Sequence, residues 1–404
     1  MVERRLPKPE VASSRLVSRS IPIFGTPAAV QDRPETPVLI GSSETLPLAS
    51  PTKNSATTHA RLLAWHRRHG RHDLPWQGTR DAYRIWVSEI MLQQTQVAAV
   101  IPYYLRFLER FPDIAALAAA PQDEVLRLWS GLGYYSRARN LQRAAQLVIE
   151  RHGGLFPRAL EDIEALPGIG RSTAAAIAAF AYGTRAAILD GNVKRVLARQ
   201  FAVAGFPGDK RIENRLWQLA AEQLPPRATG RYTQAIMDLG ATLCTRAKPA
   251  CARCPLADGC QALALGRVKD FPAPRPAKTV PTRATHMLLL VRSGELLLEK
   301  RPSSGIWGGL WSLPEVDDAA RARAHCLANY GCSIAAPRAL APLAHGFTHF
   351  KLQIQPLLCR VEKLAPAARE AGQIWLTLKE AHGAAIPVPV RKLIERLLEP
   401  SVPL

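Results

Sequence analysis

The stretch LPGIGRSTA, residues 166–174, joins two segments with helical periodicity and predicts how they meet. Pro167 and Gly168 end the first helix, and the small residues after Gly170 begin the second. Such a turn presents free backbone N–H groups at a helix N-terminus, which can hold a nucleic-acid phosphate without reading its sequence. An ordinary helix connection is the alternative. Two glycines followed by a small-residue helix favour the phosphate site.

Helical periodicity extends on both sides of this turn, so we interpret residues 59–268 as an all-α region. The apolar residues recur at spacings of three and four in Tyr83–Val100, Pro121–Trp129, Leu141–Ile149, Ser172–Tyr182, Val193–Val203 and Ile212–Leu224.

Beyond the all-α region the pattern changes. Residues 269–283 are rich in proline and basic side chains, which is typical of a stiff linker. Residues 284–404 then alternate between strand and helix patterns and predict a mixed α/β domain. The expected strands are His286–Val291, Glu295–Glu299 and Lys351–Cys359, and the expected helices are Ala319–Tyr330 and Val390–Leu398.

The charge is distributed unevenly along the 404 residues. With 53 Lys and Arg against 33 Asp and Glu the formal net charge is +20, which points to a polyanionic partner. Residues 1–58 carry a net charge of only +2, residues 59–270 carry +11, and residues 271–404 carry +7. We interpret residues 1–58 as a disordered extension; a targeting peptide and a mis-assigned start codon are the alternatives. No apolar run is long enough to span a membrane.

Four of the seven cysteines fall within 17 residues in the spacing C-x6-C-x2-C-x5-C. Clustered cysteines in a chain with cytosolic character favour a metal over disulfides, and four thiolates can hold zinc or an iron–sulfur cluster. Only one C-x2-C pair is present, whereas zinc sites commonly use two, so we expect a [4Fe–4S] cluster in the loop 244–260. Its ligands are Cys244, Cys251, Cys254 and Cys260. The other three cysteines are expected in the core.

Two carboxyl groups are candidates for acid–base chemistry. Asp190 opens a helix in LDGNVKRV and is expected to be its N-cap, where amide donors and the positive helix end would keep it ionised with a lowered pKa. Glu89 lies among apolar residues in SEIMLQQTQV, where burial would raise its pKa and make it a proton donor. A simple helix cap and a solvated helix position are the respective alternatives.

Taken together, SEIMLQQTQV, GLGYYSRARN, LPGIGRSTA, LDGNVKRV and the cysteine spacing resemble the endonuclease III superfamily of helix-hairpin-helix DNA glycosylases, and most closely its MutY-type adenine glycosylases. The resemblance runs from about residue 59 to the C-terminus. It implies an all-α helix-hairpin-helix glycosylase region, followed by a Nudix-like domain over residues 284–404.

The resemblance also implies roles for individual residues. Glu89 would protonate an adenine flipped out of the helix, and Asp190 would stabilise the oxocarbenium-like sugar. Further residues would support the active site, namely Asn192, Ser172, Gln234 and Trp76, while others would contact DNA, namely Gln93, Gln94, Tyr134, Gly168, Gly170 and Arg171. Where bifunctional relatives carry a lysine this chain has Ser172, which implies hydrolysis without strand cleavage.

In the C-terminal domain, Gly309, Glu315 and Arg323 echo a Nudix box. The carboxylates that would hold magnesium are replaced by Ala324, Leu327 and Ala328, so pyrophosphate hydrolysis is not expected. The domain instead resembles an 8-oxoguanine-recognition module, with the sensing residues Phe347, Thr348 and His349.

The expected partner is duplex DNA with adenine opposite 8-oxoguanine or guanine, bound by a cytoplasmic monomer, nucleoid-associated if bacterial, with no membrane contact. The alternatives are an endonuclease III-like pyrimidine glycosylase with lyase activity, a non-catalytic DNA-damage sensor and a nucleotide pyrophosphatase. Ser172 counts against the lyase. The presence of both Glu89 and Asp190 counts against the non-catalytic sensor, and the degenerate Nudix box counts against the pyrophosphatase.

Overall fold

The computed structural model describes residues 55–276, 279–365 and 372–399. Most of the predicted extension, residues 1–54, lies outside the described residues. The first described helix begins at Ser55, so it includes the last four residues of the predicted extension.

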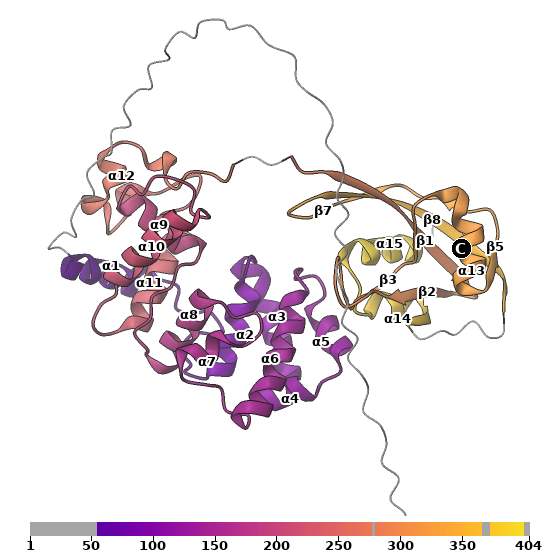
Figure 1. Ribbon diagram of the computed structural model, residues 1–404, viewed down its shortest axis with the longest axis horizontal. Helices are drawn as coiled ribbons and strands as arrows, with labels where there is room; N and C mark the ends of the chain where they lie inside the picture. Colours follow the sequence, from indigo (N-terminus) through magenta and orange to yellow (C-terminus); the bar gives the residue numbers. More distant parts are fainter. Residues whose placement is uncertain (1–54, 277–278, 366–371, 400–404) are drawn as a thin grey trace, which may run out of the picture. The chain divides into compact units, whose positions relative to one another are not determined.

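The first part of the described chain is helical, as predicted (Figure 1). Its α-helices are α1 (Ser55–His69), α2 (Ala82–Leu92), α3 (Val97–Arg110), α4 (Ile114–Ala119), α5 (Gln122–Trp129), α6 (Ser136–His152), α7 (Leu160–Glu164), α8 (Arg171–Tyr182), α9 (Gly191–Gln200), α10 (Lys210–Glu222), α11 (Thr229–Thr242) and α12 (Gln261–Ala264). Short 3-10 turns, η1 (Cys251–Arg253), η2 (Ala257–Gly259) and η3 (Val268–Asp270), complete it.

One predicted segment is divided in two. The apolar periodicity of Tyr83–Val100 continues through residues 93–96, but the helix ends there and restarts, because Gln94 takes a left-handed backbone conformation with φ of 58°. The break exposes Gln94 and separates α2 from α3. Periodicity alone does not detect it, since polar residues are compatible with the solvent face of a continuous helix.

The helices enclose two apolar cores. The first gathers buried side chains from α2 to α8, and the second gathers those of α1, α9, α10 and α11. Helix α8 belongs to both: Ala174, Ile177 and Ala178 face the first core, while Ala175 and Ala176 face the second. Such small side chains let neighbouring helices approach closely. The glycosylase-like motifs therefore converge around α8, at the junction of the two cores.

The second part of the described chain is built on a mixed sheet, which agrees with the predicted α/β domain. Its strands are β1 (Thr282–Arg292), β2 (Glu295–Lys300), β3 (Trp311–Ser312), β4 (Glu315–Val316), β5 (Cys332–Ile334), β6 (Arg338–Ala339), β7 (Leu343–Gly346), β8 (Lys351–Leu364) and β9 (Gln373–Thr377). Its helices are the 3-10 turn η4 (Ala319–Arg321), α13 (Ala322–Tyr330), α14 (Leu378–Gly383) and α15 (Val388–Leu398).

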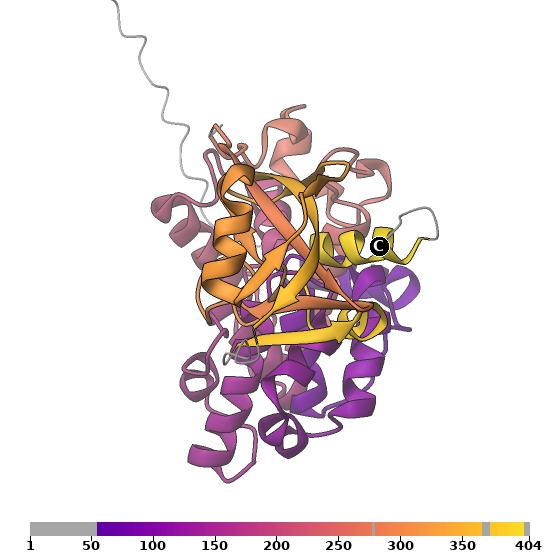
Figure 2. The same cartoon turned by 90° about the vertical axis from the view of Figure 1, so that its right-hand side faces the viewer.

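The sheet has the order β3-β2-β1-β8-β5, and its centre is the parallel pair of β1 and β8 (Figure 2). Because side chains alternate between the faces of a strand, β1 serves two cores. Leu288 and Leu290 pack on the face covered by α13, whereas Met287 and Leu289 pack on the face of α14 and α15. The sheet is thus buried on both faces.

The three isolated cysteines lie in this domain, and the prediction that they are core residues is confirmed. Cys326, Cys332 and Cys359 are each fully buried, in the cluster under α13.

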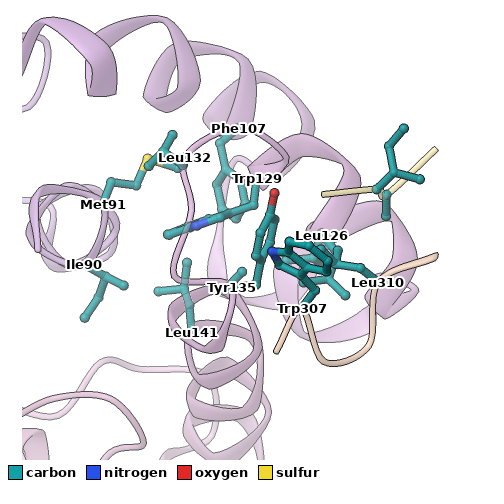
Figure 3. Packing of buried hydrophobic residues seen from close by; sticks show 14 of the residues in the cluster. Ile90, Met91, Phe107, Leu126, Trp129, Leu132, Tyr135, Leu141, Trp307 and Leu310 are labelled. Atoms are coloured by element: carbon teal, nitrogen blue, oxygen red, sulfur yellow. The ribbon is translucent and has the colours of Figure 1, made fainter. Parts of the chain in front are cut away.

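The core of helices α2 to α8 continues into the strand-rich part. Figure 3 shows Trp307 and Leu310 among the buried residues that include Leu126, Trp129 and Tyr135. Polar contacts accompany this packing, since the Arg139 guanidinium donates to the carbonyl oxygen of Gly308 at 2.5 Å.

No α-helix in the described ranges, residues 55–276, 279–365 and 372–399, is long and apolar enough to cross a membrane.

Candidate active site

Glu89 lies on α2 among buried neighbours, as the sequence predicted. The residues around it, Val87, Ser88 and Ile90, are each at most 2% exposed, and Glu89 itself faces a cavity. Burial raises the pKa of Glu89 to about 8, and the negative charge of Asp190 adds to the shift. At neutral pH this carboxylic acid is therefore protonated and can give its proton to a base.

Asp190 is the N-cap of α9, and this prediction is confirmed. Its Oδ1 accepts the backbone N–H of Val193 at 2.7 Å, and its Oδ2 accepts the amide of Asn192 at 3.2 Å. The predicted pKa direction is wrong, however: burial raises the pKa of Asp190 above its ordinary value, and the hydrogen bonds from Val193 and Asn192 and the charge of Arg195 oppose the rise.

The negative charge of Asp190 disfavours ionisation of Glu89, so the titration of Glu89 depends on the charge state of Asp190. Val193, Asn192 and Arg195 stabilise the ionised form of Asp190 and oppose the rise of its pKa. For Glu89, both burial and the charge of Asp190 raise the pKa, and nothing opposes them. The contacts of Asp190 thus favour its ionised form, whereas the causes acting on Glu89 favour its protonated form. A protonated acid within electrostatic range of a carboxylate is an arrangement that glycosidic-bond cleavage uses.

The contacts around Asp190 extend away from the cavity. Arg195 donates to the Asn192 Oδ1 at 2.8 Å and to the carbonyl oxygens of Cys244 and Gly240, both at 2.7 Å. A side chain on Gly240 would collide with the Cβ of Asn192 at 2.6 Å, so the glycine lets α11 approach the start of α9. Asn192 is thus fixed on both sides, which agrees with its predicted supporting position.

Glu89 opens into a cavity of about 700 Å³ between α1, α2, α8 and α11. Two predicted residues, Trp76 and Gln234, line it together with Glu89. The wall also carries Arg71 and Arg80, and the volume is in the range of small-ligand sites. Trp76 is 7% exposed and packs edge-on against Tyr104, so its ring forms a rigid part of the wall.

The predicted DNA-wedging residues lie on two neighbouring loops. Gln94 and Tyr134 are both exposed and both adopt left-handed backbone conformations, with φ of 58° and 49°. For residues other than glycine this conformation is unfavourable and has to be stabilised by the surroundings. The buried Arg137 supplies that stabilisation: it donates to the carbonyl oxygens of Met91 and Gln93 at 2.8 and 2.5 Å, and to that of Gly133 at 3.1 Å.

We expect Arg137→Met to lower the free energy of unfolding by about 3 kcal/mol, because several buried carbonyl oxygens would lose their donor. The loops carrying Gln94 and Tyr134 would lose their common support, and affinity for duplex DNA would fall with stability. Denaturant unfolding and DNA-binding titrations measure both effects. Arg143→Met, on the exposed face of the same helix, is the matched control and should change stability by less than about 0.5 kcal/mol. Equal stability of the two variants would contradict this role of Arg137.

The glycine turn has the predicted structure. Gly168 has φ of 80°, and a Cβ there would lie 2.9 Å from that of Asn140, while Gly170 is the N-cap of α8 without a side-chain cap. Arg171 is exposed, and its guanidinium lies 4.1 Å from the ring centroid of Trp217. Gln93 reaches the same turn, with its amide 3.4 Å from the Gly168 carbonyl oxygen. Four of the six residues predicted to contact DNA, Gln93, Gly168, Gly170 and Arg171, thus lie around the start of α8.

Ser172 follows this turn and supports the segment that leads into α9. Its Oγ accepts the backbone N–H of Leu189 at 2.9 Å, one residue before Asp190. The hydroxyl therefore links the start of α8 to the N-cap of α9.

The four clustered cysteines line one small, largely apolar cavity with Leu243, Pro249, Leu263 and Val268. The Cys244 Sγ accepts a hydrogen bond from the buried Arg199 at 3.3 Å. Burial, together with the charges of the other three cysteines, raises the pKa of Cys254 to about 11, so four thiolates here require a compensating cation. The described residues contain no group of three His, Cys, Asp or Glu side chains arranged to hold a single metal ion. The donor set and shared cavity fit a four-cysteine cofactor.

The predicted sensing loop lies between β7 and β8. Phe347 stacks on the buried Phe350 with 4.4 Å between ring centroids, and its ring is also 5.5 Å from that of Trp307. Thr348 and His349 are exposed at the loop tip, with the Thr348 Oγ1 3.4 Å from the His349 Nδ1. The aromatic support is rigid, and the polar groups are free to face a partner.

The segment that resembles a Nudix box includes β4 and α13. Helix α13 presents Leu327, which is 64% exposed, where a magnesium-binding acid would be expected. Glu315 is held by Arg301 at 2.5 Å.

Sequence reasoning missed Arg71, Arg137, Arg199 and Asp238, which are polar groups at or behind the site. Asp238 follows Ile236 and Met237 within an apolar helical run, and an acid in that setting is the one signal that could have indicated a buried role. The arginines carry no comparable signal, because the chain is rich in arginine throughout.

The all-α fold thus places Glu89 at a cavity and fixes Asp190 as the N-cap of α9, and comparison with known proteins gives the class. Residues 87–222 match the model of the HhH-GPD superfamily base excision DNA repair proteins, and residues 286–396 match the NUDIX domain. The predicted fold class is therefore confirmed, and the chain is a DNA glycosylase.

Two relatives show which family of DNA glycosylases the chain belongs to. The chain is 37% identical over 335 residues to the adenine DNA glycosylase of Buchnera aphidicola subsp. Acyrthosiphon pisum (strain APS), covering 83% of this chain and 95% of the relative. It is 34% identical over 432 residues to that of Homo sapiens, covering 91% and 79%. The chain belongs to the adenine DNA glycosylase family. Among solved structures, a thermostable thymine-DNA glycosylase is 30% identical with a TM-score of 0.47, covering 53% of this chain and 98% of the other.

Proposed function

We propose that this chain is a monofunctional glycosylase that hydrolyses the N-glycosidic bond of adenine mispaired with 8-oxoguanine or guanine in duplex DNA. The observation that carries the proposal is the pair of Glu89, with its pKa raised to about 8, and Asp190, fixed as a helix cap. Glu89 faces the cavity and has no hydrogen-bond donor among the causes of its pKa shift, whereas Asp190 accepts hydrogen bonds from Val193 and Asn192. Membership of the adenine DNA glycosylase family supports adenine as the base.

The reaction begins when adenine leaves the helix and enters the cavity. Glu89 protonates the base, which makes it a better leaving group. As the glycosidic bond breaks, positive charge develops on the sugar, and the carboxylate of Asp190 stabilises it. Glu89, now ionised, takes a proton from the water that attacks the sugar.

Recognition is divided between the two parts of the chain. The exposed Gln94 and Tyr134 enter the duplex from the glycosylase region, residues 59–268, and the α8 turn holds a phosphate. In the domain at 284–404, Phe347, Thr348 and His349 read 8-oxoguanine opposite the adenine. The linker 269–283 joins the two.

The absence of lyase activity is part of the proposal. Ser172 has no amine, and its hydroxyl is occupied by the N–H of Leu189. The nearby Lys194 forms an ion pair with Glu213, with 2.6 Å between Nζ and Oε1, so its amine is engaged by that carboxylate and is not free to form a Schiff base.

The test uses duplexes containing A:8-oxoG, A:G and thymine glycol, scored with and without alkali. We expect abasic product from A:8-oxoG, slower product from A:G, and strand scission only after alkali. Release of thymine glycol with spontaneous scission would favour the endonuclease III-like alternative and contradict the proposal.

We further propose that Cys244, Cys251, Cys254 and Cys260 hold a [4Fe–4S] cluster, because all four line one cavity. The cluster would fix the loop 244–260 and with it the cations Arg246, Lys248 and Arg253, which can contact phosphates.

Iron analysis tests the cofactor. We expect about four irons per chain and a broad absorption band in the visible range. Cys254→Ser should lose both and lower stability, whereas Cys359→Ser, in the strand-rich domain, should keep the iron. One zinc per chain without iron would contradict the cluster.

The same proposal expects a monomer on DNA, which sedimentation on duplex DNA measures. It also places the enzyme with the chromosome in the cytoplasm, the nucleoid of a bacterial cell.

A further inference from the structure

A buried carboxylate lies directly behind the cavity wall. Asp238, on α11, has a fully buried side chain. Its Oδ1 accepts the Arg71 Nε at 2.8 Å and the Arg71 Nη2 at 2.5 Å, and its Oδ2 accepts the Arg71 backbone N–H at 2.9 Å. The His66 Nε2 lies 3.3 Å from the same Oδ2. A buried charge held by this many donors on two elements is a specific arrangement, because burying an unpaired charge is costly.

The same carboxylate contacts a residue of the cavity wall. The Gln234 Nε2 donates to the Asp238 Oδ1 at 2.9 Å, one helical turn earlier on α11. Gln234, Arg71 and His66 all line the cavity into which Glu89 opens, whereas Asp238 does not. Asp238 therefore acts on the cavity through its neighbours.

The charge state of Asp238 determines how the Gln234 amide is oriented. Burial acts to raise the pKa of Asp238, but the hydrogen bonds from Arg71 and the close contact with His66 outweigh it and lower the pKa. An ionised carboxylate accepts hydrogen bonds and donates none. The amide nitrogen of Gln234 must then face Asp238, and the flipped orientation would place its oxygen against a negative charge.

We propose that Asp238 is a positioning residue that locks the Gln234 amide, so that the cavity selects a purine with an amino group at position 6. With one N–H given to Asp238, Gln234 keeps its Oε1 acceptor and its second N–H for the ligand. An acceptor beside a donor complements the amino group and ring nitrogen of adenine, as glutamine does at adenine edges in DNA. A 6-oxopurine has an oxygen acceptor at position 6. It would face the Gln234 Oε1, which is also an acceptor, and the two oxygens would repel each other.

The inference rests on the proposed function and deepens it. The test compares single-turnover base release from duplexes with adenine and with unsubstituted purine, which lacks the amino group, each opposite 8-oxoguanine. Asp238→Asn frees the amide, because asparagine can donate as well as accept. We expect the preference of the variant for adenine over purine to fall about tenfold.

A second variant keeps the test decisive if Asp238→Asn does not fold. Gln234→Met removes the amide but leaves the Arg71 contacts of Asp238, and we expect the same loss of preference. Combining both substitutions should give no further loss, since one acts through the other. Thr242→Val, which removes a hydroxyl bound to the Asp238 carbonyl oxygen at 2.8 Å on the exposed side of α11, is the control and should keep the wild-type preference.

The outcomes separate the two proposals. If the wild-type protein releases no adenine, the proposed function fails. If it does, but Gln234→Met retains the preference, or Asp238→Asn slows adenine and purine equally, then Asp238 supports only the structure and the inference is overturned.

Discussion

Glu89→Gln should lower the rate constant of adenine release by about 10³-fold while leaving affinity for the duplex largely intact. Glutamine has nearly the same shape but cannot give up a proton, so the adenine would have to leave as a poor leaving group. Positioned general acids contribute typically 10²- to 10⁴-fold. Single-turnover kinetics on A:8-oxoG duplexes measure the rate constant, and a binding titration measures affinity.

The pH dependence separates the acid role from a loss of shape. Burial and the charge of Asp190 raise the pKa of Glu89 to about 8, so the group is protonated below that pH and ionised above it. The rate of base release should therefore fall as pH rises through about 8. Glu109→Gln, at an exposed position of α3, is the matched control and should retain the wild-type rate and profile. A rate that stays constant to pH 9, or turnover by Glu89→Gln, would remove Glu89 from this role.

The sequence predicted the local geometry of the site where local chemistry decides it. An aspartate before a helical run is an N-cap because its oxygen accepts amide hydrogens that the helix leaves unpaired. Asp190 accordingly caps α9. Glycine after proline predicts a turn, and Gly168 has the positive φ that such a turn uses. Both features depend on a few consecutive residues.

Features that depend on distant residues were not predictable in this way. The pKa of Asp190 was expected below its ordinary value from its cap alone, but the surrounding helices bury it, and burial has the larger effect. The break between α2 and α3 depends on Arg137, which donates to carbonyl oxygens more than 40 positions earlier in the chain. Asp238 and Arg71 are 167 positions apart and meet only in the folded chain.

The loop 244–260 was predictable only in part. Its spacing singled out four cysteines, and the fold brings all four to one cavity. Arg199, which also lines that cavity, could not be recognised from the sequence. Its guanidinium donates to the carbonyl oxygens of Thr245 and Phe271, which are 46 and 72 positions away in the chain.

Asp190→Asn should lower the rate of adenine release at least about 10²-fold with little change in stability. Asparagine is as good an N-cap as aspartate, so the hydrogen bond to the Val193 N–H and the start of α9 can persist. What the substitution removes is the negative charge that stabilises the cationic sugar. Single-turnover kinetics and thermal unfolding measure the two quantities independently.

Two comparisons identify the charge as the cause. Asp190→Ala removes the cap as well, and it should be inactive and also less stable by about 1 kcal/mol. Asp209→Asn makes the same change at the exposed N-cap of α10 and should retain full activity. Retention of more than a tenth of the wild-type rate by Asp190→Asn would mean that the cap, and not the charge, is what the reaction needs.

The two carboxyl groups also affect one another, which gives a signature that a folding defect would not reproduce. The charge of Asp190 contributes to the raised pKa of Glu89. In Asp190→Asn that contribution is gone, so Glu89 should ionise at lower pH, and the alkaline fall of the residual activity should begin earlier than in the wild-type enzyme. An unchanged alkaline limb would show that the groups do not share a proton equilibrium, because coupling between two sites must appear in the titration of both.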